Sequence, residues 1–366
     1  MAALRRHPLA TPALFLMRRV TLRDIAEEAQ VSVMSVSLAL RGQGRLLRST
    51  RQRIQEIAKR LGYRPDPALS ALVYHRNEAK DRTEFCTVAF LTSMPTRHGW
   101  RDVRYIREYY DGAYARAEKL GYHVEAFWTR EPGMSAKRMQ QILETRGIKG
   151  LLVGPVFDRT GSIDLEWDQF CAVSLCRNLI WPKINVVDHN HHHSMTLAWR
   201  ELESRGYHRV GYAVGDMSEA ITGYLWLATH LSEQLRSREP QPNLIPPLIA
   251  KELNHMAFLR WFHKERPDVV VSPNISTLVW MREEGIAVPE EVGFLHLEAE
   301  QSGPVSGICQ HFDEVGATGV ELLHNEILRS ETGMPPVRQS IAIDGGWTEG
   351  ATLRPHPEED VLGPPA

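Results

Sequence analysis

The apolar residues near the start of the chain recur with the spacing of short amphipathic helices. The first stripe follows the i, i+3, i+4, i+7 pattern and consists of Leu22, Ile25, Ala26 and Ala29. Thr21 is placed to cap this helix, and Ser32 to cap a second helix after a three-residue break. A third stripe covers residues 54–61, and Ser49 with Gln52 has capping-box spacing at its start. Three short helices, the first two joined by a tight turn, predict an all-α helix-turn-helix head.

Further along the chain, short apolar runs alternate with helical stripes. The first series predicts strands at 87–91, 124–128, 151–153 and 172–175, with helices at 104–120 and 135–146. The second series predicts strands at 184–187, 210–214, 269–271 and 292–297, with helices ending before Gly206, around 224–235 and before Gly285. Repeated strand–helix alternation is typical of a parallel sheet with helices on both faces. Two such series predict an α/β body of two lobes, each built on a doubly wound parallel sheet.

Composition changes along the chain suggest where these parts begin and end. Pro65 and Pro67 interrupt helical structure, and a polar stretch follows them. The expected parts are a disordered extension at 1–18, the head at 19–64, a hinge and linker at 65–82, the body at 83–350 and a disordered tail at 351–366. Met17, directly before two arginines, is a candidate for the true start.

The net charge of −2 hides an asymmetry between the head and the body. Residues 1–82 hold 16 lysines and arginines against 7 acids, a net charge of +9, and the remainder holds 27 against 38, a net charge of −11. A basic head on an acidic body predicts a polyanionic partner for one end only. Four cysteines are too few for a disulfide framework, and no apolar run reaches 18 residues, so we expect a cytoplasmic protein.

Motifs spaced over nearly the whole chain carry a family resemblance. In the head they are the residues VTLRDIA at 20–26, Ala29, Val31-Ser32, Ser35-Val36-Ser37, Thr50-Arg51, Ala58 and LGYRP at 61–65. In the body they lie at 121–122, 150–153, 206–211, 285–292 and 316–323. The chain thereby resembles the LacI/GalR family of transcription regulators. The resemblance implies a homodimer whose helix-turn-helix heads bind an operator. It also implies that the body is built like a periplasmic sugar-binding protein and binds a small effector.

In that family the operator is pseudo-palindromic double-stranded DNA, and the regulators are commonly repressors. The resemblance places base contacts at Val33, Met34 and Leu38, where this chain has apolar side chains and the family often has polar ones. Guanine should therefore be read weakly there. The expected phosphate contacts are Ser32, Ser35, Ser37, Thr50, Arg51 and Tyr63. The remaining expected DNA-binding residues are Thr21 at the start of the first helix and Leu69 and Leu72 in a hinge helix. The alternatives are helix capping for the hydroxyls and a core contact for Leu72.

The effector is expected where the carboxyl ends of strands face the cleft between the lobes. The strand-end candidates are Ser93, Phe157, Asp158, Asp188, His189, Asn274 and Glu298. Trp100 and Trp226 are candidate flat surfaces for a sugar ring, and the alternative for each is a place in the core. The family's usual arginine is replaced by Ala220, so its usual pentose, hexose or purine effectors cannot be assumed.

Three other classes of function were weighed against a regulator. His189 and His193 have i, i+4 spacing suited to a metal if they share a helix, but a polar cleft rim is the preferred interpretation. No P-loop, nucleophile elbow or HExxH motif indicates an enzyme. A periplasmic solute-binding protein would have no use for the head. We therefore predict no enzyme activity, metal or cofactor, and no membrane partner.

Overall fold

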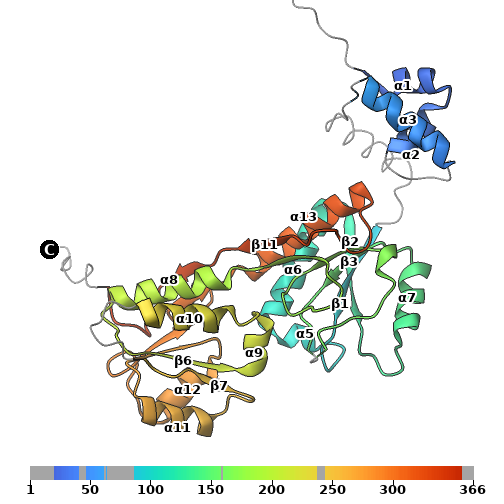
Figure 1. Cartoon of the computed structure of the whole chain (residues 1–366). Coiled ribbons are helices and arrows are strands. Elements are labelled where there is room, and N and C mark those ends of the chain that lie inside the picture. Colours follow the sequence, from blue (N-terminus) through green and yellow to red (C-terminus); the bar gives the residue numbers. More distant parts are fainter. Residues whose placement is uncertain are drawn as a thin grey trace, which may run out of the picture. The chain divides into compact units, whose positions relative to one another are not determined.

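The computed structural model of the protein describes residues 20–40, 47–61, 63, 86–157, 160–236 and 244–356, without the side chains of Ser37, Leu38 and Arg48. The chain divides into two compact units, residues 1–84 and 85–366, which are described separately (Figure 1). The predicted extension at 1–18 and the hinge and linker at 65–82 lie outside the described residues. Within the described part of the chain, no helix is long and apolar enough to cross a membrane.

The first unit consists of three helices, as the apolar stripes predicted. They are α1 (Leu22–Ala29), α2 (Val33–Leu40) and α3 (Arg48–Arg60). Thr21 caps α1 in a reciprocal capping box with Asp24, and the Ser32 hydroxyl accepts a hydrogen bond from the Ser35 amide at 3.1 Å. The capping box predicted for the third helix is wrong. Its N-cap is Leu47, which makes no side-chain cap, because α3 begins one residue before Ser49.

The three helices enclose one small apolar core. Its buried members are Ile25, Ala26, Ala29, Val36, Ala39, Ile54, Ile57 and Ala58. Two polar side chains of α3 form hydrogen bonds with the other two helices. Arg53 donates to the Ala29 carbonyl of α1 at 3.0 Å, and Gln55 donates to the Ala39 carbonyl of α2 at 3.4 Å. These contacts leave the start of α2 on the surface of the unit.

The second unit contains two six-stranded sheets, one for each predicted lobe. The first sheet has the order β11-β5-β4-β3-β1-β2, and all its pairs are parallel. Its strands are β1 (Cys86–Thr92), β2 (Tyr122–Trp128), β3 (Gly150–Val153), β4 (Cys171–Ser174), β5 (Asn185–His189) and β11 (Ser340–Ile343). Its helical segments are α5 (Gly99–Asp102), α6 (Arg104–Lys119), α7 (Ala136–Thr145), η1 (Trp167–Gln169) and α13 (Phe312–Arg329). Residues of α6 and α13 pack in one core cluster, and residues of α7 pack in the other.

The second sheet has the order β12-β10-β9-β8-β6-β7. Its strands are β6 (Val210–Gly215), β7 (Leu248–Ala250), β8 (Val269–Ser272), β9 (Gly293–His296), β10 (Gly307–Cys309) and β12 (Gly346–Thr348), the last antiparallel to β10. Its helices are α8 (His191–Ser204), α9 (Asp216–Ile221), α10 (Leu225–Arg236), α11 (His255–Glu265) and α12 (Ser276–Glu283). Helices α8 and α10 contribute to one core cluster, and α11 and α12 to the other. Both lobes are thus doubly wound, as predicted.

The chain crosses between the lobes three times. It crosses after β5 into α8, after β10 into α13, and after β11 into β12. Strand β5 therefore belongs to the first sheet, and its assignment to the second series was wrong. Apolar runs predict strands but not their neighbours, and β5 is held in place by β11, about 150 residues further along the chain.

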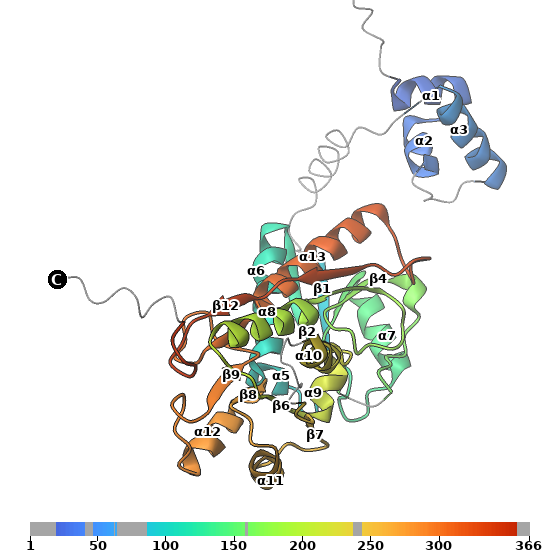
Figure 2. The same ribbon diagram turned by 60° about the vertical axis from the view of Figure 1, so that its left-hand side comes forward.

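Helices α6 and α13 pack backbone against backbone and lie side by side in both ribbon views (Figures 1 and 2). A Cβ atom added at Gly316 would lie 2.0 Å from the Tyr109 carbonyl oxygen, and one added at Gly112 would lie 1.9 Å from that of Asp313. The two glycines are therefore required by the close approach of the helices.

The end of the body extends beyond the predicted boundary at 350. Thr352 and Leu353 are buried in the second lobe, and the Arg354 amide donates to the Tyr207 hydroxyl at 2.9 Å. The prediction of a disordered tail beginning at 351 was therefore wrong for these residues. Residues 357–366 lie outside the described part of the chain.

Candidate functional site

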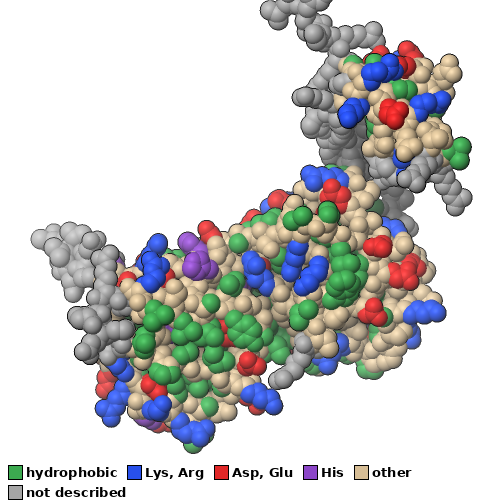
Figure 3. Space-filling view, in the orientation of Figure 1, with side chains coloured by type: hydrophobic (Ala, Val, Ile, Leu, Met, Phe, Trp, Pro, Cys, Tyr) green, Lys and Arg blue, Asp and Glu red, His purple; other side chains and the backbone are tan. Residues whose placement is uncertain are grey.

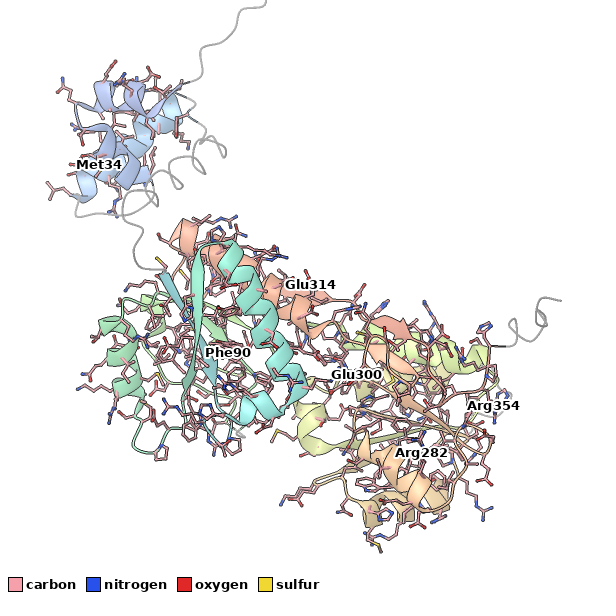
Figure 4. The ribbon with its side chains drawn as sticks, turned by 180° about the vertical axis from the view of Figure 1, so that it is seen from behind. Met34, Phe90, Arg282, Glu300, Glu314 and Arg354 are labelled. Atoms are coloured by element: carbon pink, nitrogen blue, oxygen red, sulfur yellow. The ribbon has the colours of Figure 1, made fainter. Side chains whose placement is uncertain are left out.

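The head is basic and presents apolar side chains at the start of its second helix. Residues 20–63 contain eight lysines and arginines and four acids, and several basic side chains are visible on the face shown in Figure 3. Val33 is 42% exposed and Met34 is 72% exposed, whereas Val36 and Ala39 of the same helix are fully buried. Met34 lies at the surface of the unit (Figure 4). Two of the three expected base-contacting side chains are thus accessible, and that of Leu38 is outside the description.

The predicted phosphate contacts lie around the helix starts of the head. The Ser32 and Ser35 hydroxyls are 2.9 Å apart, and the Thr21 hydroxyl donates to Asp24 at 2.8 Å. These three hydroxyls therefore take part in capping the helices, which is the alternative to phosphate contact given above. Thr50 and Arg51 are half-buried in the first turn of α3. Tyr63 packs against the head core. The side chain of Ser37 and all of Leu69 and Leu72 lie outside the described residues.

In the body, Asp188 is the centre of a charged group at the first crossover. Its carboxylate is 1% exposed and lies 3.3 Å from Arg177 Nε and 3.6 Å from His191 Nε2. It also accepts a hydrogen bond from the His189 amide at 2.8 Å. A buried carboxylate is stable only with such partners, so Asp188 is fixed where the chain passes from one lobe to the other.

His189 connects the other crossovers to the first. Its ring is completely buried, with Nδ1 3.1 Å from the Gln310 carbonyl oxygen and Nε2 2.6 Å from the Ser194 hydroxyl. A carbonyl only accepts, so Nδ1 donates, and Nε2 of the neutral ring accepts from the hydroxyl. Burial and the neighbouring His191 hold the pKa of His189 well below its usual value. At the third crossover, a Cβ atom on Gly345 would come within 2.9 Å of this ring.

The histidines do not form the considered metal site. His189 ends β5 and His193 lies in α8, so the two do not share a helix. His189 and His191 also do not form the predicted polar cleft rim, because both are buried. The His192 ring is hydrogen-bonded to the Thr229 hydroxyl at 2.9 Å. Across the described ranges, no group of three or more metal-binding side chains is present.

Trp226 lies beside this group in the second lobe. It is 2% exposed, and its ring packs edge-on against His191 at 5.0 Å between centroids. The fully buried Glu219 nearby accepts a hydrogen bond from the Tyr212 hydroxyl, and burial raises its pKa. Sequence reasoning missed Glu219, because a single acid in a helix carries no signal of burial. Described atoms left without a hydrogen-bond partner here are Glu219 Oε2, His191 Nδ1 and Trp226 Nε1.

Asn274 and Glu298 follow strands β8 and β9 of the second lobe. Burial raises the pKa of the Glu298 carboxyl to about 7, against the opposing effect of Arg104. Arg104 of the first lobe also donates to the Glu298 carbonyl oxygen in the second. The Asn274 side chain accepts from the Ser276 amide at 2.9 Å at the start of α12. The two lobes are therefore linked here by Arg104 and the backbone carbonyl of Glu298.

The remaining candidates of the first lobe have different environments. The Ser93 hydroxyl donates to the Pro155 carbonyl at 3.2 Å and accepts from the Phe157 amide at 3.1 Å, which orders this loop. Trp100 is 4% exposed, with its ring 4.5 Å from Tyr110. Trp100 therefore packs in the core, the alternative given for it, and offers no open surface for a sugar ring. Asp158 lies outside the described residues.

Comparison with known proteins places the head in a family. Residues 21–66 match the family model described as bacterial regulatory proteins, lacI family. The head thus resembles the heads of this family. A relative of the LacI-family head is the HTH-type transcriptional regulator pepR1 of Lactobacillus delbrueckii subsp. lactis, 39% identical over 57 residues. That match covers 16% of this chain and 17% of the relative's length.

Solved structures extend the likeness of fold to the body. A lac repressor dimer bound to operator and the anti-inducer ONPF matches with a TM-score of 0.54 at 18% identity, over 92% of this chain and 99% of that one. The transcriptional regulator CelR in complex with cellobiose matches with a TM-score of 0.58 at 19% identity, over 91% and 100%. The LacI-family head and the two-lobed body thus follow in the order seen in these regulators. For the body, this likeness is one of fold.

Proposed function

We propose that this protein is a sequence-specific DNA-binding transcription regulator, a repressor, controlled by a small molecule bound between its two lobes. The observation that carries the proposal is the accessible start of α2 in a basic LacI-family head. The second helix of a helix-turn-helix enters the major groove and places its N-terminal residues over base edges. Basic residues of the same unit supply the attraction to phosphates.

The domain boundaries and DNA contacts remain those expected from the sequence, apart from the corrected tail. Ser32, Ser35, Thr50 and Arg51 lie at the starts of α2 and α3, where amides and hydroxyls are suited to phosphate oxygens. We assign residues 65–82, with Leu69 and Leu72, to the hinge that enters the minor groove.

We place the effector site around Asp188 and Glu298 at the lobe junction and Asn274 after β8, where Trp226 offers only its indole Nε1 because its ring is buried. Supporting this are the unpartnered polar atoms near Asp188, because buried polar groups ordinarily find a protein or ligand partner. The CelR structure contains cellobiose, which favours a sugar-related effector. Binding there would shift the balance between lobe arrangements, and the three crossovers joined by His189 would transmit that shift.

A homodimer is the assembly that the surface of the body supports. Exposed apolar side chains of the second lobe include Leu231 and Leu235 on α10 and Ile249 on β7. Green side chains gather over this part of the body in Figure 3. Exposed apolar patches commonly mark interaction sites, and the similar lac repressor was observed as a dimer on its operator. Two heads would then meet a pseudo-palindromic site, in a cytoplasmic protein.

Operator selection with the purified full-length protein tests this function. Random duplexes that survive repeated binding should converge on a pseudo-palindrome, because two equivalent heads read two half-sites. A matched protein lacking residues 1–82 should enrich no sequence yet retain its thermal stabilisation by whichever sugar stabilises the full chain. Failure of the full-length protein to enrich any sequence would contradict the proposal.

A further inference from the structure

The reading surface of the head contains almost no hydrogen-bonding side chains. The eight residues of α2 are VMSVSLAL, in which the polar members are Ser35 and Ser37. Ser35 is half-buried and bonded through its hydroxyl to Ser32, so it serves the helix cap. Bidentate recognition of guanine or adenine requires arginine, lysine, asparagine or glutamine, and α2 has none of them.

What this surface offers instead is an accessible apolar pair. Val33 and Met34 are the first two residues of α2, and both are exposed although they belong to a helix whose other described apolar residues face the core. In the major groove, the apolar group available for such contacts is the methyl at C5 of a pyrimidine. Packing these apolar side chains against a charged, hydrated phosphate would not lower the free energy of binding.

We propose that Val33 and Met34 read the C5-methyl group of pyrimidines in the operator. This inference rests on the proposed function and names what the same head recognises. Its occupant is the major groove of DNA, for which the net positive charge of the head is complementary. Thymine and 5-methylcytosine both carry that methyl group, so methylation of a cytosine at these positions would strengthen binding.

The expected effect follows from the burial of one methyl group. Removing a buried methyl costs roughly 0.8 kcal/mol, which corresponds to about a fourfold loss of affinity. Two methyls in one half-site should act independently, so their joint removal predicts a loss of about fifteenfold.

The decisive experiment changes the DNA and leaves the protein intact. Each thymine of the selected operator is replaced in turn by uracil, which deletes the methyl and preserves every hydrogen-bonding group. Binding of the full-length protein is measured by fluorescence anisotropy at fixed salt. We expect a fourfold loss at the one or two thymines of each half-site that contact α2, and equal binding elsewhere. At those positions, a C·G pair carrying 5-methylcytosine should bind about fourfold more tightly than unmethylated C·G.

Protein variants assign the effect to the two residues. The double variant Val33→Ala, Met34→Ala should bind thymine and uracil operators equally. The control is Leu47→Ala, since Leu47 is also an exposed apolar residue of the head, 76% exposed, but lies before α3. This control should keep the full preference, and circular dichroism verifies that all variants fold.

The outcomes separate the inference from the function. Equal binding of an operator with uracil at every thymine would overturn methyl recognition while leaving a sequence-specific regulator in place. A preference that survives in the double variant would also overturn it. Absence of any selected operator would instead refute the proposed function itself.

Discussion

Replacing Gly316 by alanine should weaken the body by forcing α6 and α13 apart. The new Cβ would lie 2.0 Å from the Tyr109 carbonyl oxygen, where a normal contact is at least 1.4 Å longer, and the obstacle is backbone that no side-chain rotation can move. Overpacking of this kind costs about 1–3 kcal/mol, while alanine in a helix gains up to about 1 kcal/mol over glycine. Because the contact is so short, we expect the upper part of this range, a net loss of about 2 kcal/mol.

Thermal unfolding of the full-length protein, followed by calorimetry, measures this loss. A change of about 2 kcal/mol should lower the Tm of a body of this size by about 4–8 °C. The matched control is Gly215→Ala, because a Cβ there has Ser218 Oγ at 4.0 Å as its nearest neighbour and its φ is −80°. The control should change stability by less than about 1 kcal/mol. Equal Tm values for the two variants would refute the close packing of α6 on α13.

Three further predictions concern the functional residues. Glu298→Gln should raise the Tm at pH 8 and lose this advantage as the pH falls towards 5. The wild-type carboxyl, whose pKa is raised to about 7 in the folded protein, carries its charge there only at the higher pH. A difference in Tm that stays constant across this range would argue against the raised pKa. Asp188→Asn should lower the free energy of unfolding, measured in urea, by roughly 3 kcal/mol, because it leaves Arg177 and His191 without their carboxylate. A loss below about 1 kcal/mol would show that the group is not buried. Arg51→Ala should reduce the slope of log K against log salt for operator binding by about 1, and an unchanged slope would remove Arg51 from the phosphate contacts.

The head was the most predictable part of the fold because its signals are local. The stripe from Leu22 to Ala29 and the caps at Thr21 and Ser32 depend on residues within one or two turns, and the structure confirms them. The third cap failed because capping-box spacing can also occur inside a first turn, as it does at Ser49. Local patterns therefore predict helices better than they predict the residue at which a helix starts.

The body shows what local patterns leave undetermined. The run at 184–187 correctly predicted a strand, but its neighbour β11 comes from the far end of the chain. Strand-end reasoning identified Asp188 and Glu298 at the lobe junction, because polar residues after buried strands gather at the same edge. It could not show that Tyr110 covers Trp100 or that Glu219 turns inward, because these depend on packing between distant segments.

The most direct test of the account is the ratio of affinities for the selected operator and for a scrambled duplex of equal length. Fluorescence anisotropy with the full-length protein at physiological salt measures both. A sequence-specific regulator should prefer its operator by at least about a thousandfold. A ratio near one would mean that the basic head binds DNA only through its charge, and would contradict the central claim.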